Sequence, residues 1–178
     1  MTRHSERSEA QSRAVTLLIR FATGCLDLAR HDKYGNASHN HHMVEVSIKY
    51  AGGLHCDAVH GPSQATLKTD APTDNRGKGE AFSPTDLVAT ALGTCMSTIM
   101  GMKADELGVD VRGMTVSVQK EMSKDAPRRI VGLPSEVHVP LPADSPHREA
   151  LEQAALNCPV HKSLPDSIDR PVKFFWEG

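Results

Sequence analysis

The sequence predicts an α+β fold, in which strands gather in runs on either side of a long helix instead of alternating with helices one by one. Three short strand-like segments occupy residues 43–69, and a long capped helix follows them. Two further strand-like segments, a second helix and a last strand fill the rest of the 178 residues. A chain of this length can enclose one hydrophobic core, so we expect one main domain.

The first 42 residues differ in composition from the rest of the chain. They are mostly polar and charged, with one apolar stretch at residues 15–28 and a run rich in Asn and His at residues 31–42. Regular patterning begins only at Met43. We therefore predict a weakly ordered N-terminal extension over residues 1–42 and a folded domain over residues 43–178.

The first predicted strand shows alternation of apolar and polar side chains, which is typical of a half-buried strand. Its apolar face consists of Val44, Val46, Ile48 and Tyr50. A glycine turn at residues 51–53 leads into a second strand at 54–60, and Gly61-Pro62-Ser63 leads into a third at 65–69.

The central helix has strong signals at both ends. Ser83 suits the N-cap, Pro84 suits the first helical position, and Asp86 completes a capping box, while Gly108 suits the C-terminal end. These residues predict a helix over 84–107. Helical spacing predicts one buried face, formed by Val88, Ala91, Leu92, Cys95, Ile99 and Met102.

The C-terminal half is predicted from its pattern of apolar runs and breaks. Residues 109–122 and 129–139 indicate two long strands joined by a turn at 125–127. A helix over 146–157, a short helix beginning at Pro159 and a last strand over 168–176 complete the domain.

Composition excludes several classes of function. The net charge of −2 and an aromatic content of 4% argue against nucleic acid and anionic membrane surfaces as partners. No apolar run of membrane-spanning length is evident, so we expect no membrane association. Four cysteines in 178 residues do not form the dense framework of a secreted domain, so we expect a cytoplasmic protein.

Two of the cysteines lie where a redox thiol would be placed. Cys95 lies in the middle of the central helix, and Cys158 lies at the N-terminal end of the short helix, three residues before His161. A helix N-terminus lowers a thiol pKa, so this position predicts Cys158 to be the more acidic thiol. Each cysteine also has a simpler interpretation as a small buried hydrophobic residue.

A zinc site is a weaker hypothesis. Cys56 with His60 and Cys158 with His161 contain the ligand types of a two-Cys, two-His site, but their spacing is loose. Three histidines of the extension, His39, His41 and His42, could bind metal adventitiously. We therefore expect neither a metal nor another cofactor.

Several short motifs in the same order resemble the OsmC/Ohr family, the osmotically inducible and organic hydroperoxide resistance proteins. The resemblance runs from about Met43 to Trp176. The motifs are Gly52–Cys56, His60–Ser63, Gly77–Glu80, Ser83–Leu87 with Cys95, and Cys158–His161.

The resemblance implies a fold in which antiparallel sheets wrap central helices in an intertwined homodimer, with two active sites at the subunit interface. It implies a cysteine-based peroxidase, acting in oxidative or osmotic stress defence without haem, flavin or metal. By the same analogy Cys95 is the peroxidatic thiol and Cys158 the resolving thiol. The substrate is an organic hydroperoxide, and a dithiol, such as a protein-bound lipoyl group, is the reductant.

The sequence departs from the family pattern at two positions. Peroxidatic members place an Arg where this chain has His55, and a Glu where it has Thr85. The residues that could activate the thiol here are His55, Thr85, Asp86, Glu80 and His161. The alternative is a diverged member with weak or no peroxidase activity that binds a small apolar ligand at the dimer interface.

Overall fold

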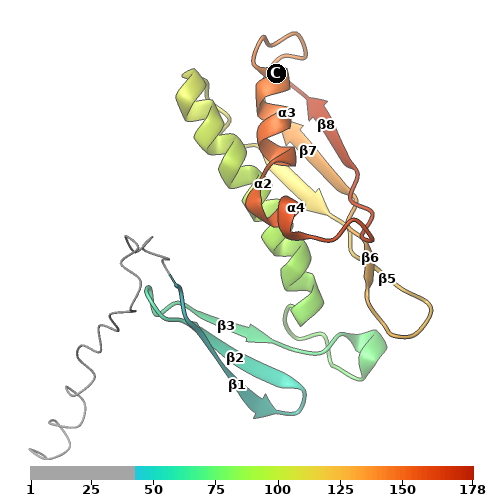
Figure 1. Cartoon of the computed structure of the whole chain (residues 1–178). Helices are drawn as coiled ribbons and strands as arrows, with labels where there is room; N and C mark the ends of the chain where they lie inside the picture. Colours follow the sequence, from blue (N-terminus) through green and yellow to red (C-terminus); the bar gives the residue numbers. More distant parts are fainter. Residues whose placement is uncertain (1–42) are drawn as a thin grey trace, which may run out of the picture. The chain divides into compact units, whose positions relative to one another are not determined.

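One long helix and three small sheets organise residues 43–178, which are the residues that the computed structural model describes (Figure 1). The predicted α+β class is confirmed. Residues 44–178 form one compact unit. The weakly ordered extension predicted for residues 1–42 lies outside the described residues.

The first sheet contains three antiparallel strands in the order β1-β2-β3. Their bounds are Val46–Gly52, His55–His60 and Thr66–Thr69. All three were predicted, although the first turn lies at Gly53 and Leu54, one residue later than expected. Both turn residues have positive φ, 58° and 69°, which glycine adopts readily and leucine rarely does.

The predicted burial of the first strand is wrong within this chain. Ile48 is 65% exposed and Tyr50 is 63% exposed, and Val46 is exposed as well. The alternation is real, but no element of residues 43–178 covers this face. The sequence pattern therefore identified an apolar face without identifying what covers it.

Helix α2 spans Pro84–Leu107, as predicted from its end signals. The Ser83 hydroxyl accepts a hydrogen bond from the backbone N–H of Asp86 at 3.2 Å, and the Asp86 carboxylate accepts one from the N–H of Ser83 at 2.8 Å. Gly108 ends the helix at a φ of 68°. The loop before the helix contains one short 3₁₀ helix, Thr73–Asn75.

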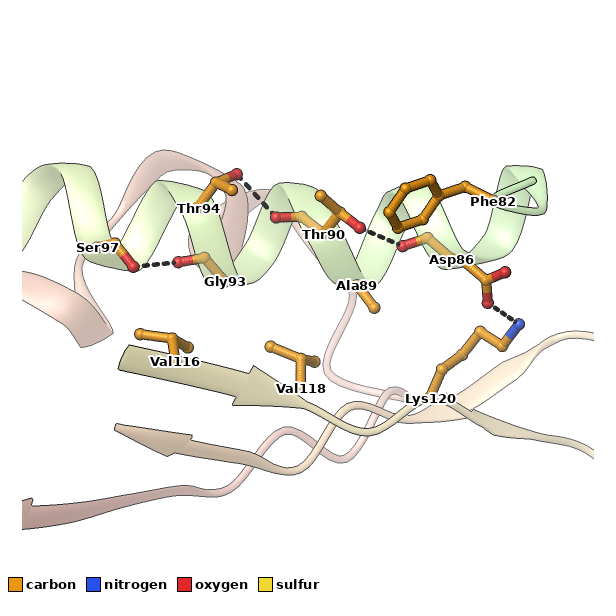
Figure 2. Close-up of a pocket in the computed structure, with 10 residues that line it drawn as sticks. All are labelled: Phe82, Asp86, Ala89, Thr90, Gly93, Thr94, Ser97, Val116, Val118 and Lys120. Atoms are coloured by element: carbon orange, nitrogen blue, oxygen red, sulfur yellow. Dashed lines mark hydrogen bonds and ion pairs between the residues drawn. The ribbon is translucent and has the colours of Figure 1, made fainter. Parts of the chain in front are cut away.

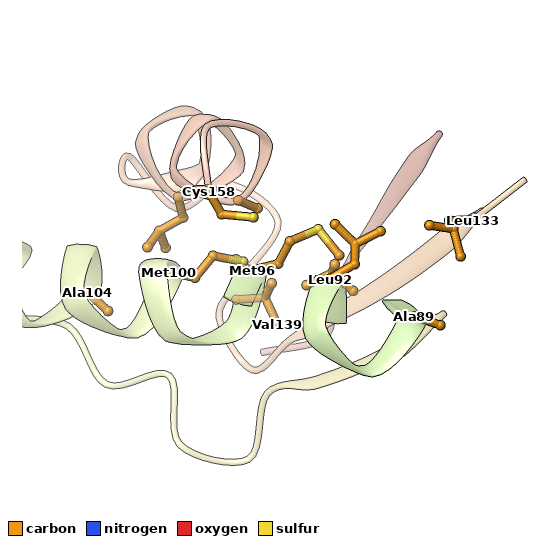
Figure 3. Packing of buried hydrophobic residues seen from close by; sticks show 11 residues of the cluster. Ala89, Leu92, Met96, Met100, Ala104, Leu133, Val139 and Cys158 are labelled. Carbon is orange, nitrogen blue, oxygen red and sulfur yellow. The ribbon is translucent and has the colours of Figure 1, made fainter. Parts of the chain in front are cut away.

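The buried face of α2 differs from the predicted one. Cys95 and Ile99 are only partly buried at its margin, and Met102 is exposed. Leu92 is the one residue common to both faces (Figure 3). The buried residues of α2 are Ala89, Leu92, Gly93, Met96, Met100 and Ala104.

Helix α2 is also long and apolar enough, by length and composition alone, to cross a membrane. No such segment was expected from the sequence. In the structure one stripe of the helix packs in the protein core, as Figure 3 shows. Core helices of globular proteins commonly meet the same criterion, so this observation does not make α2 a membrane span.

The two long strands predicted for the C-terminal half are each divided. β4 (Thr115–Val118) pairs antiparallel with β7 (Ser135–Val139), and β5 (Glu121–Met122) pairs with β6 (Ile130–Gly132). Pro134 has no N–H for the sheet and lies at the break between β6 and β7. Its carbonyl accepts a hydrogen bond from the N–H of Gln119 at 2.9 Å. The expected hairpin therefore forms as two short pairs.

Two helices connect β7 to the last strand, β8 (Val172–Trp176). They are α3 (Arg148–Leu156) and α4 (Pro159–Ser163), both shorter than predicted. β8 pairs with β7 in parallel, which differs from the expected all-antiparallel sheets because a helical crossover separates these two strands. Residues from α2, β7, α3 and α4 share the core, with Leu133, Val137, Val139, Leu151, Ala155 and Cys158 all buried.

Candidate active site

The fold brings the thiols of Cys95 and Cys158 together. Cys95 is partly buried on α2, and α2 packs against α4, where Cys158 is the N-cap residue. Cys95 is near enough to Cys158 to raise the pKa of its thiol. Both cysteines are free, so the site is a dithiol.

The predicted acidity of Cys158 is wrong. Burial raises the pKa of the Cys158 thiol above its ordinary value, and the neighbouring Cys95 raises it further. The N–H of His161 donates to the Cys158 Sγ at 3.4 Å and favours the thiolate, as expected at a helix N-terminus. This contribution is smaller than the cost of burial, because Cys158 is fully buried.

His161 reaches Cys158 through its backbone. Its ring Nδ1 is buried and has no hydrogen-bond partner among residues 43–178. Burial lowers the pKa of His161, and the positive charges of Arg170 and Lys162 lower it further. The imidazole is therefore neutral at neutral pH, and the positive charge that the sequence suggested beside Cys158 is disfavoured.

A second polar cluster lies at the N-terminal end of α2, where Lys120 reaches the helix from the segment after β4 (Figure 2). The Lys120 ammonium donates to the Asp86 carboxylate, to the Thr85 hydroxyl at 3.1 Å and to the Ser83 hydroxyl at 3.4 Å. Burial opposes the ionisation of Asp86, but Lys120 and Ser83 outweigh it and hold the pKa of Asp86 below its ordinary value. Thr85 and Asp86 thus bind a lysine that the sequence analysis did not single out.

A groove of about 550 Å³ lies between α2 and β4 beside this cluster. Figure 2 shows Val116 and Val118 of β4 directed toward α2, opposite Gly93 and Ala89. Gly93 permits this close approach, because a Cβ at that position would lie 3.1 Å from a methyl carbon of Val118. The full lining comprises Phe82, Asp86, Ala89, Thr90, Gly93, Thr94, Ser97, Val116, Val118 and Lys120.

His55 and Glu80 meet a third residue, Asp70. The His55 Nε2 lies 3.2 Å from a Glu80 carboxylate oxygen and 3.5 Å from an Asp70 carboxylate oxygen. Within residues 43–178, no hydrogen bond or ion pair of His55, Glu80, Thr85 or Asp86 reaches Cys95. Four of the five predicted activating residues therefore form two clusters apart from the dithiol of their own chain, and only His161 contacts it, through its backbone N–H.

The weaker zinc hypothesis has no support in the described part of the chain. The one group of three or more potential ligands found there is His55 with Asp70 and Glu80. Cys158 lies beside Cys95, and the ring of His60 binds the Ser63 hydroxyl at 2.6 Å. The other candidates, His39, His41 and His42, lie outside the described residues.

Two residues of these clusters, Lys120 and Asp70, were not predicted from the sequence. Lys120 continues the alternation of Val116 and Val118, so a period of two would have placed it on the face toward the helix. Asp70 gave no such signal, because its partners are the backbone N–H groups of Lys78 and Glu80, both at 3.0 Å. Only the folded loop brings those groups to the carboxylate.

Comparison of the chain with known proteins identifies its family. A family model for OsmC-like proteins matches residues 77–170, which is more than half of the chain. A solved structure with 41% identity and a TM-score of 0.70 is a candidate osmotic stress induced and detoxification response protein from Psychrobacter arcticus. That match covers 74% of this chain and 96% of the Psychrobacter protein.

More distant structures show the same fold. An organic hydroperoxide resistance protein OsmC from Legionella pneumophila has 15% identity and a TM-score of 0.62, covering 75% of this chain and 96% of its own. The organic hydroperoxide resistance protein OhrB of Bacillus subtilis has 18% identity and a TM-score of 0.53, covering 74% and 97%. No curated protein matches the chain. The family match and the 41% identical structure lead to one conclusion: this chain belongs to the OsmC family.

Proposed function

We propose that this protein reduces organic hydroperoxides with the Cys95–Cys158 pair, in defence against oxidative or osmotic stress. The observation that carries the proposal is the meeting of two free thiols that are distant in sequence, one partly exposed and one fully buried. Membership of the OsmC family supports the same chemistry.

The unequal burial of the two thiols supports different roles for them. Cys158 has no exposed surface and a raised pKa, so it is a poor first nucleophile for a dissolved peroxide. Cys95 is partly exposed, so a peroxide can reach it. Cys95 therefore attacks and Cys158 resolves, in agreement with the family analogy and against the acidity expected from the position of Cys158 at a helix N-terminus.

The proposed reaction has three steps. The Cys95 thiolate attacks the outer oxygen of ROOH, the O–O bond breaks, and the products are Cys95 sulfenic acid and an alkoxide that takes a proton to become ROH. The Cys158 thiolate then attacks the sulfenic sulfur, the S–O bond breaks, and the products are a disulfide and a hydroxide that takes a proton to become water. A dithiol, such as a protein-bound lipoyl group, reduces the disulfide by thiol–disulfide exchange and is itself oxidised.

A peroxide titration with peptide mapping tests the proposal. One equivalent of cumene hydroperoxide added to the reduced protein should consume two thiols and yield a Cys95–Cys158 disulfide that dithiothreitol reverses. The rate of disulfide formation should rise with pH, because the raised pKa of Cys158 limits its thiolate fraction. Sulfinic acid at Cys95 with Cys158 still free would refute the resolving role.

The peroxidase acts, in this proposal, as a homodimer with active sites at the subunit interface. The support is the uncovered apolar face of β1, where Val46, Ile48 and Tyr50 are all about half exposed or more. Exposed apolar faces of this kind mark interaction surfaces. The cluster of His55, Asp70 and Glu80 belongs to the same sheet and the loop after it, so a second copy could bring this cluster to the dithiol of its partner.

Light scattering tests the dimer with a matched pair of variants. The wild-type chain should give twice its 19.3 kDa mass at micromolar concentration. Ile48→Asp should shift the mass toward one chain, because it places a charge on the apolar face, whereas Lys49→Asp on the adjacent position should not. A wild-type protein with the mass of one chain would reject the proposal.

Binding of a small apolar ligand is a second candidate function, and the groove beside α2 is the observation that favours it. Ala89, Val116, Val118 and Phe82 form an apolar part of the groove, whose volume of about 550 Å³ suits a small molecule. In this alternative the cysteines are structural. The peroxide titration separates the two functions, because a binding protein would not lose two thiols to one peroxide.

A further inference from the structure

The cluster of His55, Asp70 and Glu80 has the ligands and the geometry of a metal site. His55 begins β2, Asp70 directly follows β3, and Glu80 lies in the loop that leads to α2. One imidazole nitrogen and two carboxylate oxygens lie within 4.8 Å of one another. Within one chain this constellation makes no hydrogen bond or ion pair to the dithiol, so metal binding can be measured without peroxide.

The orientation of the imidazole leaves its lone pair directed at the two carboxylates. The Nδ1 of His55 lies 2.9 Å from the carbonyl oxygen of Gly53, which can only accept, so Nδ1 carries the hydrogen. In the neutral ring the Nε2 atom then carries a lone pair, which faces carboxylate oxygens of Glu80 and Asp70. Such an arrangement is repulsive unless a proton or a metal cation lies between these groups. A backbone carbonyl that accepts the other ring N–H is also the usual support of a metal-bound histidine.

Asp70 supplies the second observation. Its side chain is fully buried, and one oxygen accepts hydrogen bonds from the N–H groups of Lys78 and Glu80. The other oxygen, which faces His55, has no hydrogen-bond partner among residues 43–178. A buried carboxylate oxygen without a partner is costly, and a cation would satisfy it.

The two distances from the His55 Nε2 fit a small divalent ion. Ligand atoms about 2.0–2.2 Å from a tetrahedral zinc ion are separated by about 3.3–3.6 Å. The observed separations from Nε2 are 3.2 Å to Glu80 and 3.5 Å to Asp70. One charge opposes binding, the ammonium of Lys78, but it lies 3.8 Å from the other oxygen of Glu80 and is 72% exposed.

We propose that His55, Asp70 and Glu80 bind a first-row divalent cation of the zinc type. The imidazole disfavours Mg²⁺ and Ca²⁺, which prefer all-oxygen sites. Three protein ligands leave at least one coordination position open, and the exposed carboxylate of Glu80 gives that position access to solvent. The proposal replaces the expectation from the sequence that the protein binds no metal.

Cobalt binding to the reduced full-length protein tests the site, because Co²⁺ reports its ligands spectroscopically. The background variant has His39, His41 and His42 replaced by Ala, which removes the adventitious ligands of the extension. We expect one Co²⁺ per chain, displaced by Zn²⁺, with visible ligand-field bands and without the near-ultraviolet charge transfer of thiolate ligation. His55→Gln and Glu80→Gln should each weaken binding by at least about tenfold, as loss of a ligand requires.

Matched controls keep the test decisive. His60→Gln changes a histidine on the same strand that binds Ser63 instead, so it should leave the affinity unchanged. Lys78→Gln removes the opposing charge and should leave the affinity equal or tighter. A thiolate charge-transfer band, or an affinity that His55→Gln and Glu80→Gln do not change, would assign the metal to other residues and overturn the proposal. Absence of binding would overturn it as well, and would show that a proton alone occupies the space between the imidazole and the carboxylates.

Discussion

Cys95→Ser is expected to abolish peroxide consumption by this protein. The serine hydroxyl is not ionised at neutral pH, so the variant lacks the thiolate that attacks the peroxide bond. Hydroperoxide loss in the presence of a dithiol should fall to the rate of the buffer. The substitution is nearly isosteric at a partly buried position, so the melting temperature should change little and the loss can be attributed to chemistry.

Two companion variants separate the roles of the remaining thiols. Cys158→Ser should complete one rapid reaction with peroxide and then accumulate sulfinic acid at Cys95, because no neighbouring thiol traps the sulfenic acid. Cys56→Ser is the matched control, since Cys56 is a free cysteine on β2 that has no place in the proposed reaction. Full turnover in Cys95→Ser would remove the protein from the class of cysteine peroxidases that use this residue.

Leu92→Ala is expected to have the largest effect on stability. The Leu92 side chain is completely buried in the cluster of Figure 3, together with Met96 and Leu133. Removing three buried carbons leaves a cavity that the surrounding helices and sheet fill only in part. We expect a loss of about 2–5 kcal/mol in the free energy of unfolding, measured by urea denaturation.

Thr98→Ala on the same helix is the control for that measurement. Thr98 is exposed, and its hydroxyl donates only to the carbonyl of Thr94 one turn earlier at 2.9 Å. Its replacement should change the free energy of unfolding by no more than about 0.5 kcal/mol. Equal effects of the two substitutions would mean that Leu92 is not at the centre of the core.

The bounds of α2 could be predicted because the signals that set them are local. Ser83, Pro84, Asp86 and Gly108 act within one turn of the helix end, and each adopts the expected cap geometry. The buried face could not be predicted with the same success. Apolar and small residues occur almost all round this helix, so spacing alone could not choose between the face containing Cys95 and the one containing Met96.

The features of the site that depend on neighbouring residues in the sequence could be predicted. Those that depend on burial by other elements, or on the fold of a loop, could not. Cys95 and Cys158 stood out by their local context, but the acidity of Cys158 depends on its burial by other elements. The interaction of His55 with Asp70 needs the whole loop from 70 to 80, because backbone groups of that loop hold the carboxylate. The exposed face of β1 likewise depends on a covering element that the pattern does not name.

The parallel pairing of β8 with β7 has a consequence for the newly made chain. Synthesis delivers α2 with Cys95 first, then the α3–α4 crossover with Cys158, and only afterwards β8, which pins that crossover to the sheet. A ribosome-bound chain that lacks β8 would therefore carry an attacking thiol whose partner is not yet held in place. Under the proposed chemistry, its sulfenic acid would be open to irreversible oxidation. The youngest molecules in an oxidatively stressed cell would then be the most easily damaged, and the docking of one C-terminal strand would end that vulnerability.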